Sequence, residues 1–196
     1  MKIYVNDMEL DFSLENEKTC GDILNQLEIE FEKNNGTIFS IKINDNDINA
    51  EKIDEIYLKP IEEIDSIKVI SIFAQDIIDS LKSLSTEIEE LNSDLEQLPV
   101  FLQGNSQSKV PVILTKFADI FDNLCHIISL SAIFPNIFDK VQIDNMSISD
   151  FIKDFGPLLE DFENAIKEND TVTIGDIAEY EIKPRFESLV STVKDL

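Results

Sequence analysis

Apolar residues recur in a strict four-three alternation within residues 72–98, IFAQDIIDSLKSLSTEIEELNSDLEQL. They occupy Ile77, Leu81, Leu84, Ile88, Leu91, Leu95 and Leu98. After Ile78 every residue between these positions is polar or charged, so the pattern predicts a long helix with a narrow a/d seam. We expect Ser71 to cap this helix and Pro99 to end it, because proline cannot supply the N–H that a helix interior needs.

The seam helix must pack either on its own chain or on a second copy. With Ile77 at position d, the g positions are Ser80, Glu87 and Asp94. An antiparallel homodimer would set these acidic residues opposite each other, and a parallel dimer would gain no e/g ion pairs. The pattern therefore favours packing within the chain, and a monomer over a homodimer.

Three more helices are expected after the seam helix, at 109–134, 149–168 and 173–195. The first has apolar residues around most of its circumference, which indicates a buried central helix. Short connections make an up-down bundle the default arrangement of such helices. The loop before them contains Gly104, and residues 136–148 are expected to form a second loop that lies on the core.

Two of these helices contain residues that disturb helical geometry. Gly156-Pro157 predicts a kink or a break in the helix that starts at Ser149. Thr173 is expected to cap the last helix, and Pro184 to bend it.

The first seventy residues alternate instead with a period of two. Runs at 2–5 and 8–14 flank Asn6-Asp7, which predicts a β-hairpin. Thr19, with Asp22 three residues later, predicts a helix cap. The helix that follows carries an apolar stripe, and further strands are expected at 37–43 and 66–71. The stripe consists of Ile23, Leu24, Leu27 and Phe31.

Residues 1–71 resemble a ubiquitin-like β-grasp domain in the order of their elements: hairpin, helix, strand, irregular crossover and strand. A generic α+β sandwich is the alternative. The resemblance implies a small sheet whose exposed face serves as a docking surface. Ubiquitin-like modifiers act through a C-terminal Gly-Gly, whereas this chain ends Lys194-Asp195-Leu196, so we do not expect their activity here. The predicted fold is α+β, with a β-grasp domain at 1–71 and an all-α, roughly four-helix bundle at 72–196.

Forty acidic residues against sixteen basic ones give a net charge of −24. This charge repels nucleic-acid backbones and anionic membranes, so neither partner is expected. No apolar run reaches the length of a membrane span, and MKIYVNDMELDF lacks the apolar core of a signal peptide. Two cysteines make no disulfide framework. Together these features predict a cytoplasmic protein.

From the sequence we assign no residue to a catalytic, cofactor-binding or metal site. Asp45-x-Asp47-x-Asn49 copies the start of a calcium loop, but Ala50 and Ile56 replace its glycine and its bidentate glutamate, which favours a solvated turn. His126, the only histidine, has Asp122 four residues away, and such a pair would hold a metal ion only weakly.

Two more side chains have a chemical and a structural interpretation. Cys20 lies in a first helical turn, where the helix dipole could lower its pKa. Arg185, the only arginine, clamps a carboxylate either of the bundle or of a ligand. Cys125 and His126 point in different directions on a helix and form no catalytic pair.

We therefore predict a non-enzymatic protein-interaction module: an adaptor, scaffold or chaperone-like protein. Its partner is expected to be basic or an amphipathic helix, as for export chaperones of helical subunits. The alternative is a small-molecule- or metal-binding enzyme, with a pocket between the kinked helices lined by Tyr180, Arg185 and carboxylates. The stretches MKIYVND…FSLENEKT and DIAEYEIKPRFESL are similar to uncharacterised bacterial proteins of spirochaetes and clostridia, a resemblance that implies no activity.

Overall fold

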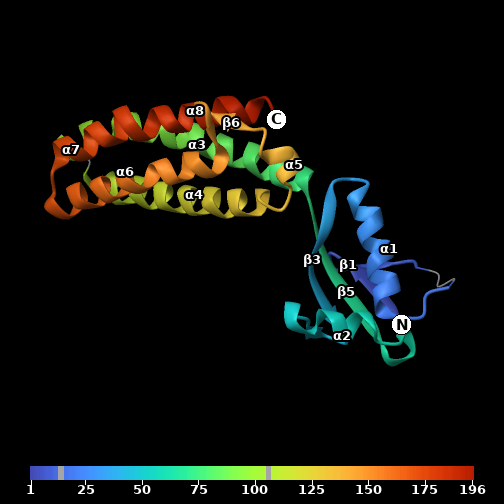
Figure 1. Ribbon diagram of the computed structural model, residues 1–196. Helices are drawn as coiled ribbons and strands as arrows, with labels where there is room; N and C mark the ends of the chain where they lie inside the picture. The colour runs from blue at the N-terminus through green and yellow to red at the C-terminus, as the bar shows by residue number, and fades with distance from the viewer. Residues whose placement is uncertain (13–15, 105–106) are drawn as a thin grey trace. The chain divides into compact units, whose positions relative to one another are not determined.

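The computed structural model describes residues 1–12, 16–104 and 107–196. The chain divides into two compact units, Met1–Asp76 and Ile77–Leu196. The first unit combines a sheet with short helices, and the second is built mainly of helices (Figure 1). The fold is therefore α+β. The sequence boundary was expected at 71/72, but β5 continues to Phe73 and the first residues of α3 cluster with the first unit.

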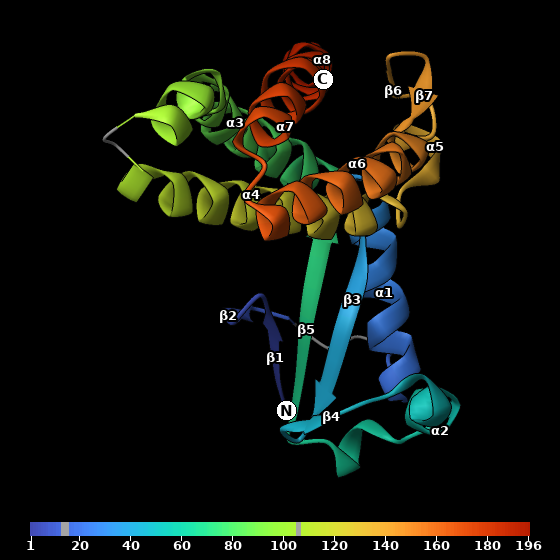
Figure 2. The same ribbon diagram turned by 90° about the vertical axis from the view of Figure 1, so that its left-hand side faces the viewer.

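The first unit contains a five-stranded sheet in the order β2-β1-β5-β3-β4. Strand β1 pairs parallel to β5, and the other neighbours pair antiparallel. The long strands β3 and β5 run side by side at its centre (Figure 2). The bounds are β1 Lys2–Val5, β2 Met8–Leu10, β3 Gly36–Ile43, β4 Asn46–Asp47 and β5 Ser66–Phe73. The predicted second strand reached residue 14, and residues 13–15 lie outside the described part of the chain.

Helix α1 (Cys20–Glu32) covers one face of this sheet and closes the core of the unit. The Thr19 side chain accepts a hydrogen bond from the Asp22 N–H, and the Asp22 carboxylate accepts one from the Thr19 N–H. This reciprocal capping box confirms the predicted start of the helix. The predicted stripe is also confirmed, because its four residues are buried against sheet residues such as Ile67 and Val69.

Within the described residues, two-residue turns with positive φ make three hairpins. Asn6-Asp7 joins β1 to β2 as predicted. The turn between β3 and β4 is Asn44-Asp45, one residue earlier than expected, and Asn46–Asp47 pair as β4. Asp144-Asn145 joins β6 (Gln142–Ile143) to β7 (Met146–Ser147), in a stretch expected to be a loop. Asparagine and aspartate tolerate the left-handed backbone that each turn requires.

The remaining short elements connect the main ones. In the first unit, the crossover to β5 holds η1 (Ala50–Lys52), α2 (Ile53–Tyr57) and η2 (Ile61–Glu63). In the second, α5 (Pro135–Phe138) lies within the stretch predicted as a loop. As expected, this stretch contributes to the core, because Phe138 and Ile143 are buried.

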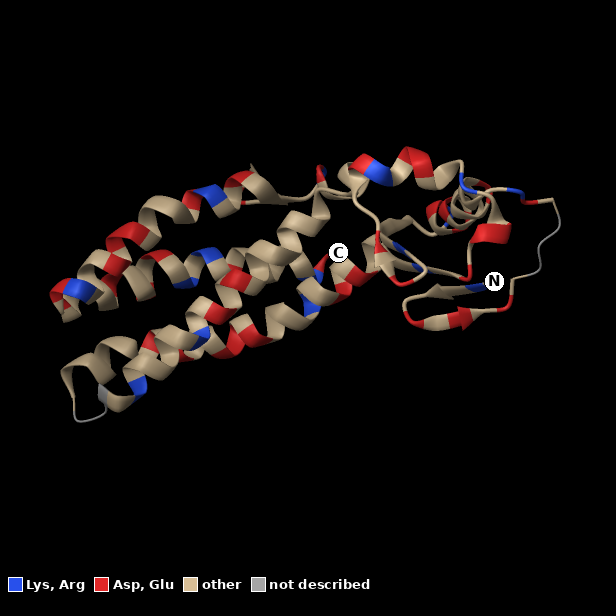
Figure 3. Cartoon of the chain, turned by 90° about the horizontal axis from the view of Figure 1, so that it is seen from below, with Lys and Arg blue, Asp and Glu red and all other residues tan. Residues whose placement is uncertain are grey.

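Helices α3, α4, α6 and α8 are the long elements of the second unit. Their bounds are α3 Ala74–Gln103, α4 Val110–Ser131, α6 Ile148–Glu168 and α8 Lys183–Lys194, with η3 (Gln107–Lys109) before α4. All seven seam residues of α3 are at most 4% exposed, which confirms that the seam packs within the chain. Acidic side chains dominate the charges along these helices (Figure 3).

Contacts between the four helices show that α3 and α8 run antiparallel, as do α4 and α6. Lys116 on α4 pairs with Glu90 and Asp94 on α3. On α8, Lys183 and Lys194 pair with α3 residues in the reverse order of the chain, Glu96 and Glu89 respectively. Phenylalanine rings fill the interior. The pairs Phe117–Phe162, Phe121–Phe155 and Phe155–Phe186 join α4, α6 and α8.

The prediction that Pro99 ends the seam helix is wrong, because α3 continues to Gln103. Leu98 and Leu102, on either side of the proline, are both buried. Pro99 also lies against Gly175, where an added Cβ would be only 3.1 Å from the proline Cγ. The buried leucines and this close contact offset the one backbone hydrogen bond that the proline removes.

Gly156-Pro157 does not break α6 either, since the helix is continuous from Ile148 to Glu168. Both residues are exposed, whereas Phe155 and Phe162 anchor the helix to the core on either side of them. The helix begins after Ser147, one residue earlier than expected, because the Ser147 hydroxyl accepts from the Asp150 N–H.

The last predicted helix, 173–195, consists of three segments. Helix α7 (Thr171–Asp176) is capped by Asp170 and not by Thr173, because Asp170 accepts from the Val172 and Thr173 N–H groups. The π-helical segment η4 (Ile177–Ile182) then leads into α8. Pro184 lies in the first turn of α8, directly after these wider turns, so the irregularity lies before the proline.

Candidate functional site

A groove lined largely by apolar residues lies between β2 and α1 in the first unit. It has a volume of about 640 Å³. Strand residues form one wall and helix residues the other. The lining residues are Val5, Met8, Glu9, Leu10, Phe12, Gln26, Leu27, Ile29, Glu30 and Phe31. We call this feature the β2–α1 groove.

The sheet register explains why the strand wall is apolar. Met8 pairs with Val5 and Leu10 pairs with Ile3, and Ile3 is buried beneath α1. Paired residues lie on the same face of a sheet, so Met8 and Leu10 also face the helix side. Strand β2 extends the sheet beyond the part that α1 covers, which leaves these two side chains without a full apolar neighbourhood.

Three apolar side chains of the groove are strongly exposed. Met8 is 71% exposed, Ile29 is 55% exposed and Leu10 is 39% exposed. Ile29 lies on α1 outside the buried stripe, because its position in the helical repeat turns it away from the sheet. Single exposed apolar residues are normal, but a cluster in a groove marks an interaction site.

Strand β2 is also the last strand of the sheet on its side. Within the described residues, no strand pairs with its other edge. An unpaired edge presents backbone N–H and C=O groups to the solvent, and such an edge is a template for another strand. The groove therefore combines apolar side chains with an unsatisfied backbone edge.

The charged residues that line the groove are acidic. Glu9 accepts hydrogen bonds from Lys2 (3.0 Å) and Tyr4 (3.4 Å), and Glu30 pairs with Lys33. Both glutamates are more than half exposed, so these pairs are screened by water. The residues of Met1–Asp76 include seven lysines and eighteen acidic residues. A basic partner would therefore meet a favourable field at the groove.

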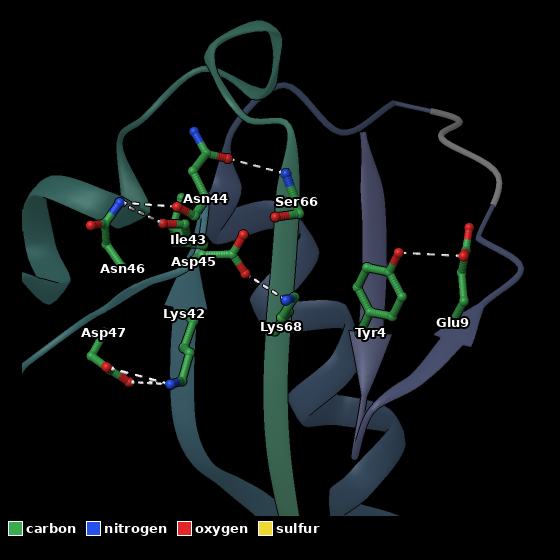
Figure 4. A network of polar contacts seen from close by, with 10 residues as sticks. All are labelled: Tyr4, Glu9, Lys42, Ile43, Asn44, Asp45, Asn46, Asp47, Ser66 and Lys68. Atoms are coloured by element: carbon green, nitrogen blue, oxygen red, sulfur yellow. Dashed lines mark hydrogen bonds and ion pairs between the residues drawn. The ribbon is translucent and has the colours of Figure 1, made fainter.

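The opposite face of the sheet combines ion pairs with exposed apolar side chains such as Ile70, which is 50% exposed and alternates on β5 with the buried Val69 and Ser71. Lys42 on β3 pairs with Asp47 on β4, and Lys68 on β5 pairs with Asp45 in the turn between β3 and β4 (Figure 4). The hydrogen bond from Lys68 holds the pKa of Asp45 below its usual range. This exposed sheet face was the expected docking surface. It bears two lysine–aspartate pairs, whereas the β2–α1 groove places several exposed apolar side chains around one hollow.

This arrangement also accounts for the calcium-like motif. Asp45 lies in a hairpin turn and Asp47 on a short strand, and each pairs with a lysine. Among the described residues, no group of three or more histidine, cysteine or acidic side chains is placed to hold a metal ion.

The structure does not bring the other candidate residues into one site. Burial raises the pKa of the Cys20 thiol to about 11, so the expected lowering by the helix dipole is wrong. Cys20 is fully buried, and desolvation of the thiolate outweighs the dipole. Burial also raises the pKa of Cys125. His126 and Asp122 are both exposed on α4.

Arg185 clamps the bundle itself. Its Nε donates to Asp154 on α6 (2.9 Å), and its Nη1 donates to Glu181 (2.8 Å). Tyr180 is 64% exposed, while Phe155 and Phe186 are fully buried in the adjacent core. This geometry provides no support for the alternative enzyme site between Tyr180 and Arg185.

The residues that matter most in the groove, Met8 and Ile29, were not selected from the sequence. Two signals were present. Ile29 is an isoleucine outside the apolar stripe of its helix, and Met8 begins the strand that the hairpin places at the edge. Neither signal shows that the two side chains border one groove, because this depends on the position of α1 against the sheet.

A family model described as "Domain of unknown function (DUF8042)" matches residues 79–192, which is more than half of the chain. The chain belongs to the DUF8042 family. A second model, the TP0873 N-terminal domain, matches residues 1–72 and therefore spans the sheet and the groove. The two matches correspond to the two units of the structure.

A relative of this DUF8042 protein is an uncharacterised protein of Treponema pallidum (strain Nichols). It is 24% identical over 184 residues, which cover 94% of this chain and 92% of the relative. The similarity to a spirochaete protein is thereby confirmed over both units. No solved structure matches the chain significantly. Among the described residues, no helix is long and apolar enough to cross a membrane.

Proposed function

We propose that this DUF8042 protein is a non-enzymatic protein-interaction module, an adaptor, scaffold or chaperone-like protein that docks a partner in the β2–α1 groove. The observation that carries the proposal is the exposure of Met8, Leu10 and Ile29 in one groove with an acidic rim. An apolar centre surrounded by charge is the usual anatomy of a protein interface. The acidic rim favours a basic partner.

We further propose that the first unit is a β-grasp domain of the ubiquitin-like type. Its support is the strand order β2-β1-β5-β3-β4, the parallel pairing of β1 with β5, and a single helix over one face. In this chain β5 ends at Phe73 and α3 begins at Ala74. The strand is thus followed by a helix and not by a Gly-Gly tail, which favours a docking role over conjugation.

The non-enzymatic part of the proposal is supported by the state of the reactive residues. Burial raises the pKa of Cys20 to about 11 and also raises that of Cys125, which disfavours the thiolate forms. Arg185 is occupied by two carboxylates of its own unit. We also propose a cytoplasmic monomer, a state that fits two free cysteines and a seam buried within the chain.

The proposal is tested by affinity capture of the full chain from cells that produce it, followed by mass spectrometry. The groove variant is Met8→Asp with Ile29→Asp, which places two charges in the apolar groove at positions that are already exposed. The matched control is Leu58→Asp, at a 78% exposed leucine that does not line the groove. We expect a stoichiometric partner with the wild type and the control, and its loss with the groove variant.

The docking function fails if no stoichiometric partner is captured, or if the groove variant retains the partner as well as the control does. Circular dichroism of both variants checks that the fold is unchanged. Sedimentation of the purified wild type is expected to show a monomer, and a tight dimer would overturn that part of the proposal.

A further inference from the structure

We propose that the occupant of the β2–α1 groove is an extended chain segment that adds to β2 as a further strand of the sheet. The segment carries apolar residues at alternate positions and lysine or arginine at both ends. This inference rests on the proposed docking function of the groove and names the chemistry of the partner.

The backbone of β2 is oriented to accept such a strand. In a hairpin with a two-residue turn, the residues that flank the turn, here Val5 and Met8, form a hydrogen-bonded pair. The ladder alternates, so Leu10 also bonds toward β1, while the N–H and C=O of Glu9 point to the opposite side. Glu9 thus offers one donor and one acceptor at the free edge of the sheet.

The side chains of β2 determine which residues the added strand needs. Met8 and Leu10 face the groove, and Glu9 faces the other side of the sheet, where Lys2 and Tyr4 contact it. Neighbouring strands share their faces. Every second residue of the added strand therefore lies in the groove against Met8, Leu10 and Ile29, and these positions require apolar side chains. The residues between them lie beside Glu9 and are polar.

A helix in the same groove would leave the backbone N–H and C=O of Glu9 without hydrogen-bond partners. It would cover the apolar side chains, but its own backbone groups are bonded internally, so the Glu9 groups would lose water without gaining a partner. A buried unpaired backbone group costs about 1–3 kcal/mol. A strand covers the same side chains and pairs the Glu9 groups, and this difference favours strand addition.

Acidic residues near both ends of β2 determine which residues the ends of the bound segment need. Asp7 precedes β2 and Asp11 follows it, and both are exposed. Glu30 adds a third carboxylate on the helix wall of the groove. The described residues that line the groove include no lysine or arginine. Acidic residues at both ends of the edge strand therefore match cationic residues at both ends of the occupant.

The test uses the full chain labelled with 15N and a synthetic peptide, acetyl-Lys-Lys-Val-Thr-Ile-Thr-Val-Lys-Lys-amide. We expect the peptide to shift the amide resonances of β2 and of the groove side of α1, and the Glu9 amide to become protected from exchange. The Met8→Asp, Ile29→Asp variant should lose this response and Leu58→Asp should keep it. A peptide with glutamates in place of its lysines should bind at least about tenfold more weakly at low salt, since opposite charges attract and like charges repel.

N-methylated peptides test the backbone directly. One control carries N-methyl groups on the threonine amides, and the other carries them on the amides of the first valine and the isoleucine. In either strand direction only one of these two sets of amides faces β2. We expect one control to lose binding and the other to keep it, which also reveals the strand direction. Equal behaviour of the two controls would overturn strand addition.

A lysine-flanked amphipathic peptide that is constrained as a helix separates the two proposals. If it shifts the groove resonances and the extended peptide does not, strand addition is wrong and the docking groove stands. If neither peptide shifts them, strand addition is wrong, and the capture experiment with the groove variant decides the docking function independently.

Discussion

Cys20 illustrates how burial competes with a helix dipole at a single residue. The thiol occupies the first position of α1, yet it is fully buried, and burial raises its pKa to about 11. We expect iodoacetamide to label Cys20 in the folded protein far more slowly than Cys125, which is partly exposed. Labelling of each cysteine between pH 7 and pH 9, followed by mass spectrometry, measures this difference. Equal labelling of both thiols in the folded protein would contradict the assignment.

Asn92 is a second residue whose environment has a measurable consequence. Its side chain is 8% exposed, and its Oδ1 has no hydrogen-bond partner among the described residues. A buried unpaired carbonyl costs about 1–3 kcal/mol. Asn92→Leu is therefore expected to raise the free energy of unfolding by about 1 kcal/mol, as measured by urea denaturation. The control Asn92→Asp has nearly the same shape but buries a charge, and it should destabilise the protein.

At the scale of single elements, two helical glycines differ in what surrounds them. Gly156 lies within α6, and apart from its chain neighbours and the backbone of its own helix no atom lies within 4 Å of an added Cβ. Alanine is the better helix former, so Gly156→Ala should stabilise the protein by up to about 1 kcal/mol. In Gly21→Ala the new Cβ would lie 2.7 Å from Tyr57 Cδ1 and 2.8 Å from its carbonyl oxygen. This second variant should be destabilised in the same urea titration, and a shift of both variants in the same direction would refute the contrast.

The capping interactions at the start of α1 make the stability of the protein depend on pH. The N–H groups of Lys18 and Thr19 donate to the Asp22 carboxylate and hold its pKa below the usual range. Because the pKa is lower in the folded protein, this stabilisation is complete above the unfolded-state pKa, about 3.9, and is lost as the pH falls through the folded-state value. Asp22→Asn should therefore lower the thermal midpoint at pH 7 and have a smaller effect at pH 3. An equal effect at both pH values would contradict this origin.

At the scale of the whole molecule, the net charge of −24 opposes the compact state. Salt screens this repulsion over the distances that separate surface charges. We expect the thermal midpoint to rise as ionic strength increases from about 10 to about 150 mM. Sodium, potassium and tetramethylammonium chloride should act equally, because the effect requires screening and not a specific cation. A midpoint that falls with all three salts would mean that the surface ion pairs outweigh the repulsion.

Much of the architecture could be predicted because it depends on local periodicity. The seam of α3, the stripe and capping box of α1 and the Asn6-Asp7 hairpin each involve residues only a few positions apart. The backbone alone brings such residues onto one face of a helix or around one turn. For this reason the predicted elements and their buried faces match the structure closely, and the boundaries were less accurate.

Two of the errors concern residues whose outcome depends on distant parts of the chain. Pro99 continues its helix because Gly175, far along the sequence, leaves space for the proline ring. Cys20 has a raised pKa because other elements bury it. Local rules for proline and for helix dipoles are correct on average, but packing outweighs the local rule at Pro99 and desolvation outweighs it at Cys20.

The amino-acid pattern was thus sufficient for the α+β class, the main helices and the strongly acidic character of this DUF8042 protein. The β2–α1 groove could not be predicted from this pattern. Met8 and Ile29 are separated by twenty residues, and they border one groove because the sheet places β2 at its edge while α1 crosses the face beside it. Such a surface arises from the packing of elements that are distant along the chain, and no local periodicity encodes it.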